Sequence, residues 1–364
     1  MRAQAPITAV HAAAFTIPTD APESDGTLEW SATTLVIARV RAAGREGIGY
    51  TYADTAAAEL IRGKLAGVLV GCDAWATGAR WIDMTRAVRN LGRAGICAMA
   101  ISALDIALWD LKGKLTGLPL AAMLGASRDA IMAYGSGGFT SYSTTRLRDQ
   151  LAGWATAGFR AVKMKVGRER GQDAARVAEA RKAIGPQVEL FVDANGAYTE
   201  AQALEMAVRF REQSVTYFEE PVSSDHLESL RLLRERRPAG MAVAAGEYGY
   251  DLFYFRRMLA AGAVDVIQAD ATRCGGVTGF MMAAAVAESF GVPLSSHCAP
   301  SLHAPLCCAA HGAAHLEWFH DHARIEGALF EGAPRPHEGL LAPDRARPGL
   351  GLELREHEAE RLCA

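Results

Sequence analysis

Beyond Gly125 the chain alternates between short apolar segments and segments with helical periodicity. The apolar segments have strand composition, and eight of them are predicted: Ile131–Ser136, Ala161–Val166, Leu190–Asp193, Thr216–Glu219, Val243–Glu247, Val264–Asp270, Val292–His297 and His315–Trp318. Each strand with its following helix takes up roughly 20 to 30 residues, which favours a parallel (β/α) barrel. An open doubly wound sheet is the alternative, but it usually has fewer strands and a glycine-rich first turn.

The residues before and after this alternating region follow other patterns. Residues 1–127 begin with strand-like segments and continue with helical ones such as Ala98–Leu115, so we predict a separate α+β domain. Within it Pro18–Trp30 is polar and rich in turn residues, and we expect a mobile surface loop. The barrel is expected over residues 128–324. The last section, 325–364, is rich in Pro and Gly, and we expect it to pack back on the first domain.

Composition excludes several classes of function. A net charge of −3 and a pI near 6.4 give no electrostatic case for binding nucleic acid or a membrane surface. The seven cysteines include no Cys-x-x-Cys pair, so reduced thiols in a cytoplasmic protein are expected. We find neither a signal peptide nor an apolar run long enough to span a membrane.

Ionisable residues stand at the ends of seven predicted strands, at similar spacing. They are Lys163 with Lys165, then Asp193, Glu219, Glu247, Asp270, His297 and Glu317. One such residue would usually be a helix cap or a solvated loop residue. Seven in phase are not expected by chance. Because the carboxyl ends of barrel strands meet at one mouth, the set predicts a catalytic site there.

Lys163 and Lys165 lie on one face of their predicted strand, and Val162, Met164 and Val166 lie on the other. A lysine pair is common on an exposed edge strand. The apolar opposite face instead favours a central strand covered by helices, with both lysines in a polar cavity. We expect crowding and burial to lower the pKa of one lysine, which would make it a base near neutral pH.

Three consecutive strands end in carboxylates, those of Asp193, Glu219 and Glu247. Their mutual repulsion inside a barrel mouth requires a cation. Oxygen ligands alone favour Mg²⁺, with Mn²⁺ as the alternative.

Asp270 and His297 come from neighbouring strands. A carboxylate beside an imidazole fixes its tautomer and raises its basicity. Lys165 and His297 would then face each other across the metal site. This arrangement suits removal of a proton α to a carboxylate, with the metal and Lys163 stabilising the resulting enediolate.

Together these motifs resemble the enolase superfamily, in particular the mandelate racemase subgroup. The resemblance covers essentially the whole chain and rests on Lys163-Met164-Lys165, Val192-Asp193-Ala194-Asn195, Phe218-Glu219-Glu220-Pro221, Gly246-Glu247, Asp270 with Gly275-Gly276-Val277-Thr278-Gly279, Ser296-His297 and Leu316-Glu317. It implies a modified TIM barrel, (β/α)7β, capped by the α+β domain, which the C-terminal segment completes.

The resemblance also implies a role for each residue. Asp193, Glu219 and Glu247 would be the metal ligands, Lys165 and His297 (with Asp270) the two acid/base groups. Lys163 and Glu317 would polarise the substrate carboxylate. The capping loops 18–30 and 50–54 would close the barrel mouth. Further substrate contacts are expected from Asn195, Tyr50 and Asp20, whereas Arg273 and Cys298 receive no role.

Acid-sugar dehydration, giving a 2-keto-3-deoxy acid, is the first choice of reaction because it is the commonest outcome in this subgroup. A racemase or epimerase of a 2-hydroxy acid or an amino-acid derivative is the alternative, and a non-catalytic metal-binding barrel is an alternative of another class. The segment Pro18–Trp30 is acidic and contains no Lys or Arg, so a monocarboxylic sugar acid is preferred as the substrate. We expect a homo-oligomer, a dimer or an octamer.

Overall fold

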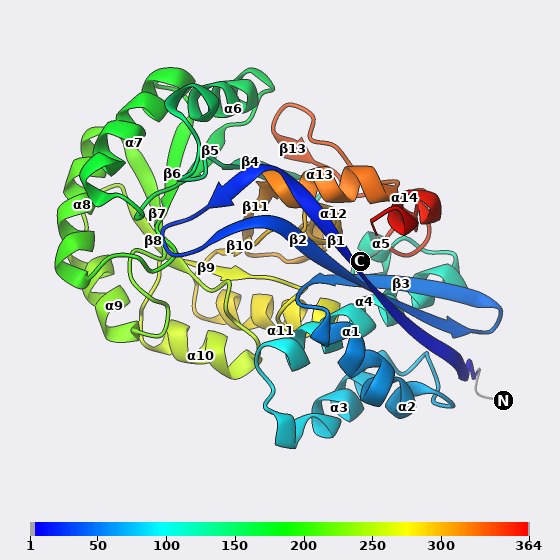
Figure 1. Ribbon diagram of the computed structural model, residues 1–364. Helices are drawn as coiled ribbons and strands as arrows, with labels where there is room; N and C mark the ends of the chain where they lie inside the picture. Colours follow the sequence, from blue (N-terminus) through cyan, green and yellow to red (C-terminus); the bar gives the residue numbers. More distant parts are fainter. Residues whose placement is uncertain (1–3, 363–364) are drawn as a thin grey trace.

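The computed structural model describes residues 4–362. Eight parallel strands form a closed barrel in chain order, and the last pairs with the first (Figure 1). They are β4 (Ile131–Gly137), β5 (Ala161–Lys165), β6 (Glu189–Asp193), β7 (Val215–Glu219), β8 (Ala242–Ala245), β9 (Val266–Ala269), β10 (Leu294–Ser296) and β11 (Ala313–Phe319). The predicted barrel is confirmed. Glu247, Asp270 and His297 lie one or two residues beyond their strands.

Helices cover the outside of the barrel. They are α6 (Thr144–Thr156), α7 (Arg170–Ile184), α8 (Glu200–Glu212), α9 (Leu227–Arg236), α10 (Leu252–Ala260), α11 (Gly276–Ser289), α12 (Pro300–Ala309) and α13 (His320–Leu329). Val162, Met164 and Val166 are fully buried in the main hydrophobic core. The side chains of Lys163 and Lys165 point the other way, into the barrel, because successive residues of a strand alternate between its faces.

The first domain is an antiparallel sheet packed on helices. Its strands are β1 (Ile7–Ser24), β2 (Glu29–Ala42) and β3 (Arg45–Tyr52). Its helices are α1 (Ala56–Leu60), η1 (Ile61–Leu65), α2 (Ala66–Leu69), α3 (Thr77–Ala87), η2 (Arg89–Leu91), α4 (Ile96–Thr116) and α5 (Leu120–Met123). The long helix α4 packs against β2 and β3, so the predicted order of strands before helices is present.

Residues 18–30 belong largely to two paired strands, so the expectation of a loop there is wrong, while its mobility stays a prediction. Strand β1 runs on to Ser24 and β2 begins at Glu29, with a register shift between Pro18 and Glu23. The tip lies against the barrel, because a Cβ on Gly26 would approach the carbonyl oxygen of Ala194 to 2.5 Å. The hairpin therefore reaches over the ends of the barrel strands (Figure 1). We call residues 18–30 the capping arm.

The C-terminal segment contacts both parts of the molecule. Strand β12 (Phe330–Glu331) pairs with β14 (Glu353–Leu354), β13 (Leu340–Leu341) pairs with β4, and α14 spans Glu356–Glu360. The backbone N–H of Leu350 donates to Asp110 in α4 at 2.8 Å, and Glu356 pairs with Arg39 in β2 at 2.6 Å. The exact division into 1–127, 128–324 and 325–364 stays a prediction. Between residues 4 and 362, no helix is long and apolar enough to cross a membrane.

Candidate active site

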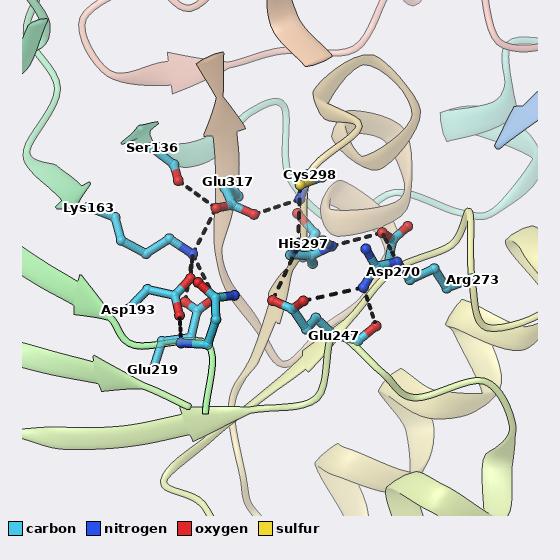
Figure 2. A network of polar contacts seen from close by, with 12 residues as sticks. Ser136, Lys163, Asp193, Glu219, Glu247, Asp270, Arg273, His297, Cys298 and Glu317 are labelled. Atoms are coloured by element: carbon cyan, nitrogen blue, oxygen red, sulfur yellow. Dashed lines mark hydrogen bonds and ion pairs between the residues drawn. The ribbon is translucent and has the colours of Figure 1, made fainter. Parts of the chain in front are cut away.

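The two lysines of β5 are buried inside the barrel mouth and paired with carboxylates. The Nζ atom of Lys163 lies 2.7 Å from both oxygens of Glu219 and 2.8 Å from Oε1 of Glu317 (Figure 2). The Nζ atom of Lys165 donates to Asp193 Oδ2 and, at 3.1 Å, to Oδ1 of Asn195. The lysines thus occupy the polar cavity that the apolar outer face of the strand predicted.

The charge balance around these lysines differs from the expectation. Burial lowers the pKa of Lys165, but the negative charges of Asp193, Glu247 and Glu219 together outweigh burial and hold that pKa above its usual value. The pKa of Lys163 is likewise raised, by Glu219 and Glu317, against the effect of burial. The predicted lowering of one lysine pKa is therefore wrong for these surroundings. The repulsion between the two cations is weaker than their attraction to the carboxylates.

The carboxylates of Asp193, Glu219 and Glu247 converge on one point. Each offers an oxygen that lies within 4.8 Å of the others, and all three residues are buried. Burial and the negative charge of Asp193 raise the pKa of Glu219 well above its usual value. Glu247 Oε2 is buried without a hydrogen-bond partner. An oxygen donor set with an unsatisfied oxygen fits a hard divalent cation.

The total charge of the mouth supports the same conclusion. Three cations, Lys163, Lys165 and Arg273, lie among five carboxylates. The carboxylates are those of Asp193, Glu219, Glu247, Asp270 and Glu317. Glu220 is a further buried carboxyl close to Glu247 and Asp193. Carboxyl groups therefore outnumber cations in this buried site, and a divalent cation would offset the excess negative charge.

His297 is held by a separate set of contacts. Its Nδ1 lies 2.9 Å from Asp270 Oδ2, while Oδ1 of Asp270 accepts from the backbone N–H and the hydroxyl of Thr272, both at 2.7 Å. Burial opposes the charge on Asp270, yet the hydrogen bond from His297 and the neighbouring basic groups, Arg273 among them, together keep the pKa of this carboxyl well below its usual range. The ring nitrogen turned toward the cavity is therefore Nε2.

Glu317 connects the lysines to the histidine loop. Its Oε1 accepts from the Ser136 hydroxyl at 2.6 Å as well as from Lys163, and its Oε2 accepts from the backbone N–H of Cys298 at 2.7 Å (Figure 2). Sequence reasoning missed Ser136, although it stands at the end of the first barrel strand, in phase with the other site residues.

Arg273 also belongs to the mouth. Its Nη1 lies 3.1 Å from the Glu247 carbonyl oxygen and 3.4 Å from Glu247 Oε1, and its Nε lies 3.7 Å from Asp270 Oδ2. Arg273 follows Asp270 by three residues, and this proximity in sequence could have suggested that its side chain lies in the mouth.

Two predicted substrate contacts stand apart from the charged groups described above, and their contact with substrate stays a prediction. Tyr50 is fully buried and donates its hydroxyl to Glu326 at 2.9 Å, so its side chain does not reach the mouth. Asp20 lies in the irregular part of the capping arm and pairs with Arg146 and with His320, each at 3.1 Å. Neither residue joins the group around Lys163 and His297.

Comparison with known proteins identifies the family. Residues 13–125 match the profile of the mandelate racemase / muconate lactonizing enzyme N-terminal domain, and residues 146–358 match the enolase C-terminal domain-like profile. The chain belongs to the mandelate racemase/muconate lactonizing enzyme family. The resemblance to the enolase superfamily is thereby confirmed.

The relatives with assigned functions are enzymes that act on sugar acids or their lactones, by their names. The chain is 34% identical over 287 residues to an arabinonate dehydratase of Saccharolobus solfataricus, covering 76% of this chain and 75% of the relative. Other curated relatives are dehydratases and cycloisomerases.

Two solved structures of the family superpose closely on this one. A mandelate racemase/muconate lactonizing enzyme-like protein from Rubrobacter xylanophilus is 52% identical with a TM-score of 0.97, over 99% of this chain and 100% of that one. A racemase from Streptomyces coelicolor A3(2) with bound magnesium is 29% identical with a TM-score of 0.93, over 98% of this chain and 100% of that one.

Proposed function

We propose that the protein is a Mg²⁺-dependent acid-sugar dehydratase that removes the proton α to a carboxylate and expels the β-hydroxyl. The product is a 2-keto-3-deoxy sugar acid. The observation that carries this proposal is the placement of two acid/base groups, Lys165 and His297, around one cluster of metal-binding carboxylates. The dehydratase names of several relatives support the choice of reaction.

Asp193, Glu219 and Glu247 would hold the Mg²⁺. When bound, the ion supplies positive charge that stabilises the negative charge developing on the substrate carboxylate. Magnesium in the related Streptomyces coelicolor structure supports this choice of metal. Lys163 and Glu317 lie beside the carboxylate cluster and would position the substrate carboxylate.

The acid and the base have different roles. Lys165 would take the α-proton on one face of the substrate. Its Nζ is held in place by Asp193 and Asn195. Protonated His297 would deliver a proton from Nε2 to the departing hydroxide, while Asp270 stabilises the imidazolium.

The preferred substrate is a monocarboxylic acid with a polyol tail. Arg146 and His320 near the capping arm are already paired with Asp20, and Arg324 is paired with Asp321. A second carboxylate would have to compete with these acidic residues for its cation. The hydroxyls of a polyol tail need no unpaired cation, because they can both donate and accept hydrogen bonds.

The second candidate function is that of an isomerase, either a racemase or an epimerase. It is favoured by the same pair of acid/base groups, because a proton removed on one side can be returned on the other. One similar structure, from Streptomyces coelicolor A3(2), is described as a racemase, which supports this alternative.

Proton NMR in D₂O separates these functions. The Mg²⁺-loaded protein is incubated with arabinonate, gluconate, galactonate and, as a dicarboxylate, galactarate. Dehydration predicts new resonances of a 2-keto-3-deoxy acid from at least one monocarboxylate, and none with the Lys165→Ala variant. Deuterium at C2 without a new product supports the isomerase. Failure of a wide panel of sugar acids to exchange or react contradicts both.

A further inference from the structure

His297, Cys298 and Glu317 bring a nitrogen, a sulfur and an oxygen donor together beside the oxygen cluster. Their ligand atoms lie within 4.8 Å of one another, and all three residues are buried. The Sγ atom of Cys298 lies 3.3 Å from Nε2 of His297 (Figure 2). This separation is close to that of two ligands of one tetrahedral zinc ion, about 3.5 Å for Zn–S and Zn–N bonds of ordinary length.

These donors are fixed by the surrounding structure. Cys298 has a left-handed backbone, with φ of 52°, and its N–H donates to Glu317 Oε2. That backbone turns its side chain toward His297. The opposite ring nitrogen, Nδ1, is held by Asp270, as the second nitrogen of a metal-binding histidine commonly is. The donor set is therefore assembled without a change of fold.

The negative charge around these donors favours a cation. Glu247 Oε2, an unsatisfied oxygen of the neighbouring carboxylate cluster, lies 3.4 Å from His297 Nε2. Burial together with the negative charges of Glu317 and Asp270 holds the pKa of the Cys298 thiol well above its usual value. The same negative charges that oppose a free thiolate attract a metal ion that replaces the thiol proton.

We propose that His297 Nε2, Cys298 Sγ and the Glu317 carboxylate form a second metal site, selective for a divalent ion of borderline softness such as Zn²⁺ or Co²⁺. Thiolate and imidazole ligands select zinc-like ions, whereas the oxygen cluster suits Mg²⁺. On binding, a sulfur–metal bond replaces the S–H bond and one proton leaves to the buffer.

The site has a functional consequence. Metal bound at Nε2 would prevent His297 from transferring protons, so Zn²⁺ would inhibit the enzyme even when Mg²⁺ is saturating. This consequence rests on the proposed role of His297. The metal site itself does not, and it can be tested without any substrate.

Cobalt absorption spectroscopy tests the site directly. The Mg²⁺-saturated protein is titrated with Co²⁺, and thiolate-to-cobalt charge-transfer absorption is followed in the near ultraviolet. The wild-type protein should show this band, and Zn²⁺ should remove it by competition. The oxygen cluster cannot produce the band because it contains no sulfur. The control variant Cys72→Ser, in the first domain, should retain it.

Two variants identify the ligands. Cys298→Ser should abolish the band, and His297→Asn should weaken Co²⁺ binding by at least about 10-fold while the thiol remains. Circular dichroism and Mg²⁺-dependent thermal stabilisation check that each variant is folded, and Cys298→Ala serves if the serine variant is not. No band in the wild-type protein, or a full band in Cys298→Ser, would overturn the proposal. Either result leaves the dehydratase assignment standing, because neither measures turnover.

Discussion

The two sides of the barrel mouth hold their proton-transfer groups in different ways. On the lysine side, around β5 to β7, Lys163 and Lys165 bind directly to Glu219 and Asp193, the carboxylates that would also hold the metal. On the histidine side, around β8 to β10, His297 is oriented by Asp270, which is not a member of the carboxylate cluster.

This difference indicates how the lysines and His297 would respond to a bound metal ion. A cation bound by Asp193 and Glu219 shares their negative charge and so weakens the attraction that keeps the lysine pKa values high. Asp270 is not a candidate metal ligand, so its contact with His297 Nδ1 does not require the metal, and only the longer contact of Nε2 with Glu247, at 3.4 Å, involves the carboxylate cluster. We therefore expect the lysine side to depend strongly on the metal and the histidine side to be preformed.

Removal of either proton-transfer group should have the largest effect. Lys165→Ala and His297→Asn should each lower turnover by about 10²- to 10⁴-fold, the usual contribution of a positioned acid or base. The sharper measurement is deuterium incorporation from D₂O into each epimer of the substrate. Each variant should lose exchange on one face only. Full activity in both variants would refute the two-base arrangement.

The orientation of His297 is tested by Asp270→Asn. The asparagine keeps the size of the side chain but removes the charge that stabilises an imidazolium and fixes the tautomer. Turnover should fall by about 10²-fold, at the lower end of the range for an acid or base. Affinity for Mg²⁺, measured by calorimetry, should stay within a few-fold of wild type. A large loss of Mg²⁺ affinity would mean that the two sides are not independent.

Mg²⁺ should stabilise the fold through the lysine side. At 100 times its dissociation constant, a ligand that binds only the folded protein adds about 2.7 kcal/mol to the free energy of unfolding. Glu219→Gln should remove most of this Mg²⁺-dependent increase in melting temperature, whereas the exposed Glu212→Gln on α8 should retain it. EDTA should return the wild-type protein to its metal-free melting temperature. Equal stabilisation of both variants would show that Glu219 is not a ligand.

The positions of the site residues could be predicted from the sequence because barrel strands repeat. Lys165, Asp193 and Glu219 stand at equivalent points of successive strand–helix units, so the topology alone brings them together. The closed barrel and its separate first domain followed from the same alternation.

The errors concern features that depend on contacts distant in sequence. The capping arm is polar like a loop, but β2 extends far enough to pair with it and the barrel holds its tip. The direction of the lysine pKa shifts depends on how many carboxylates surround each Nζ, which spacing does not reveal. Ser136 is a single hydroxyl in an apolar strand, and only its distance to Glu317 shows its role.

The smallest expected effect tests whether Glu317 links the two sides. Ser136→Ala removes one hydrogen bond to a buried carboxylate whose other partners are Lys163 on the lysine side and the Cys298 N–H on the histidine side. Hydrogen bonds to charged groups contribute about 1.5 to 3 kcal/mol, so urea unfolding should show a loss of that order or slightly less. The exposed Ser289→Ala, at the end of α11, should change stability by less than about 0.5 kcal/mol.

Kinetics test the coupling itself. If Glu317 couples the two sides, Ser136→Ala should also raise KM a few-fold. The double variant with Asp270→Asn should then lose more kcat/KM than the product of the two single losses. Strictly multiplicative effects would instead show that the lysine side and the histidine side act independently, each fixed by its own carboxylates.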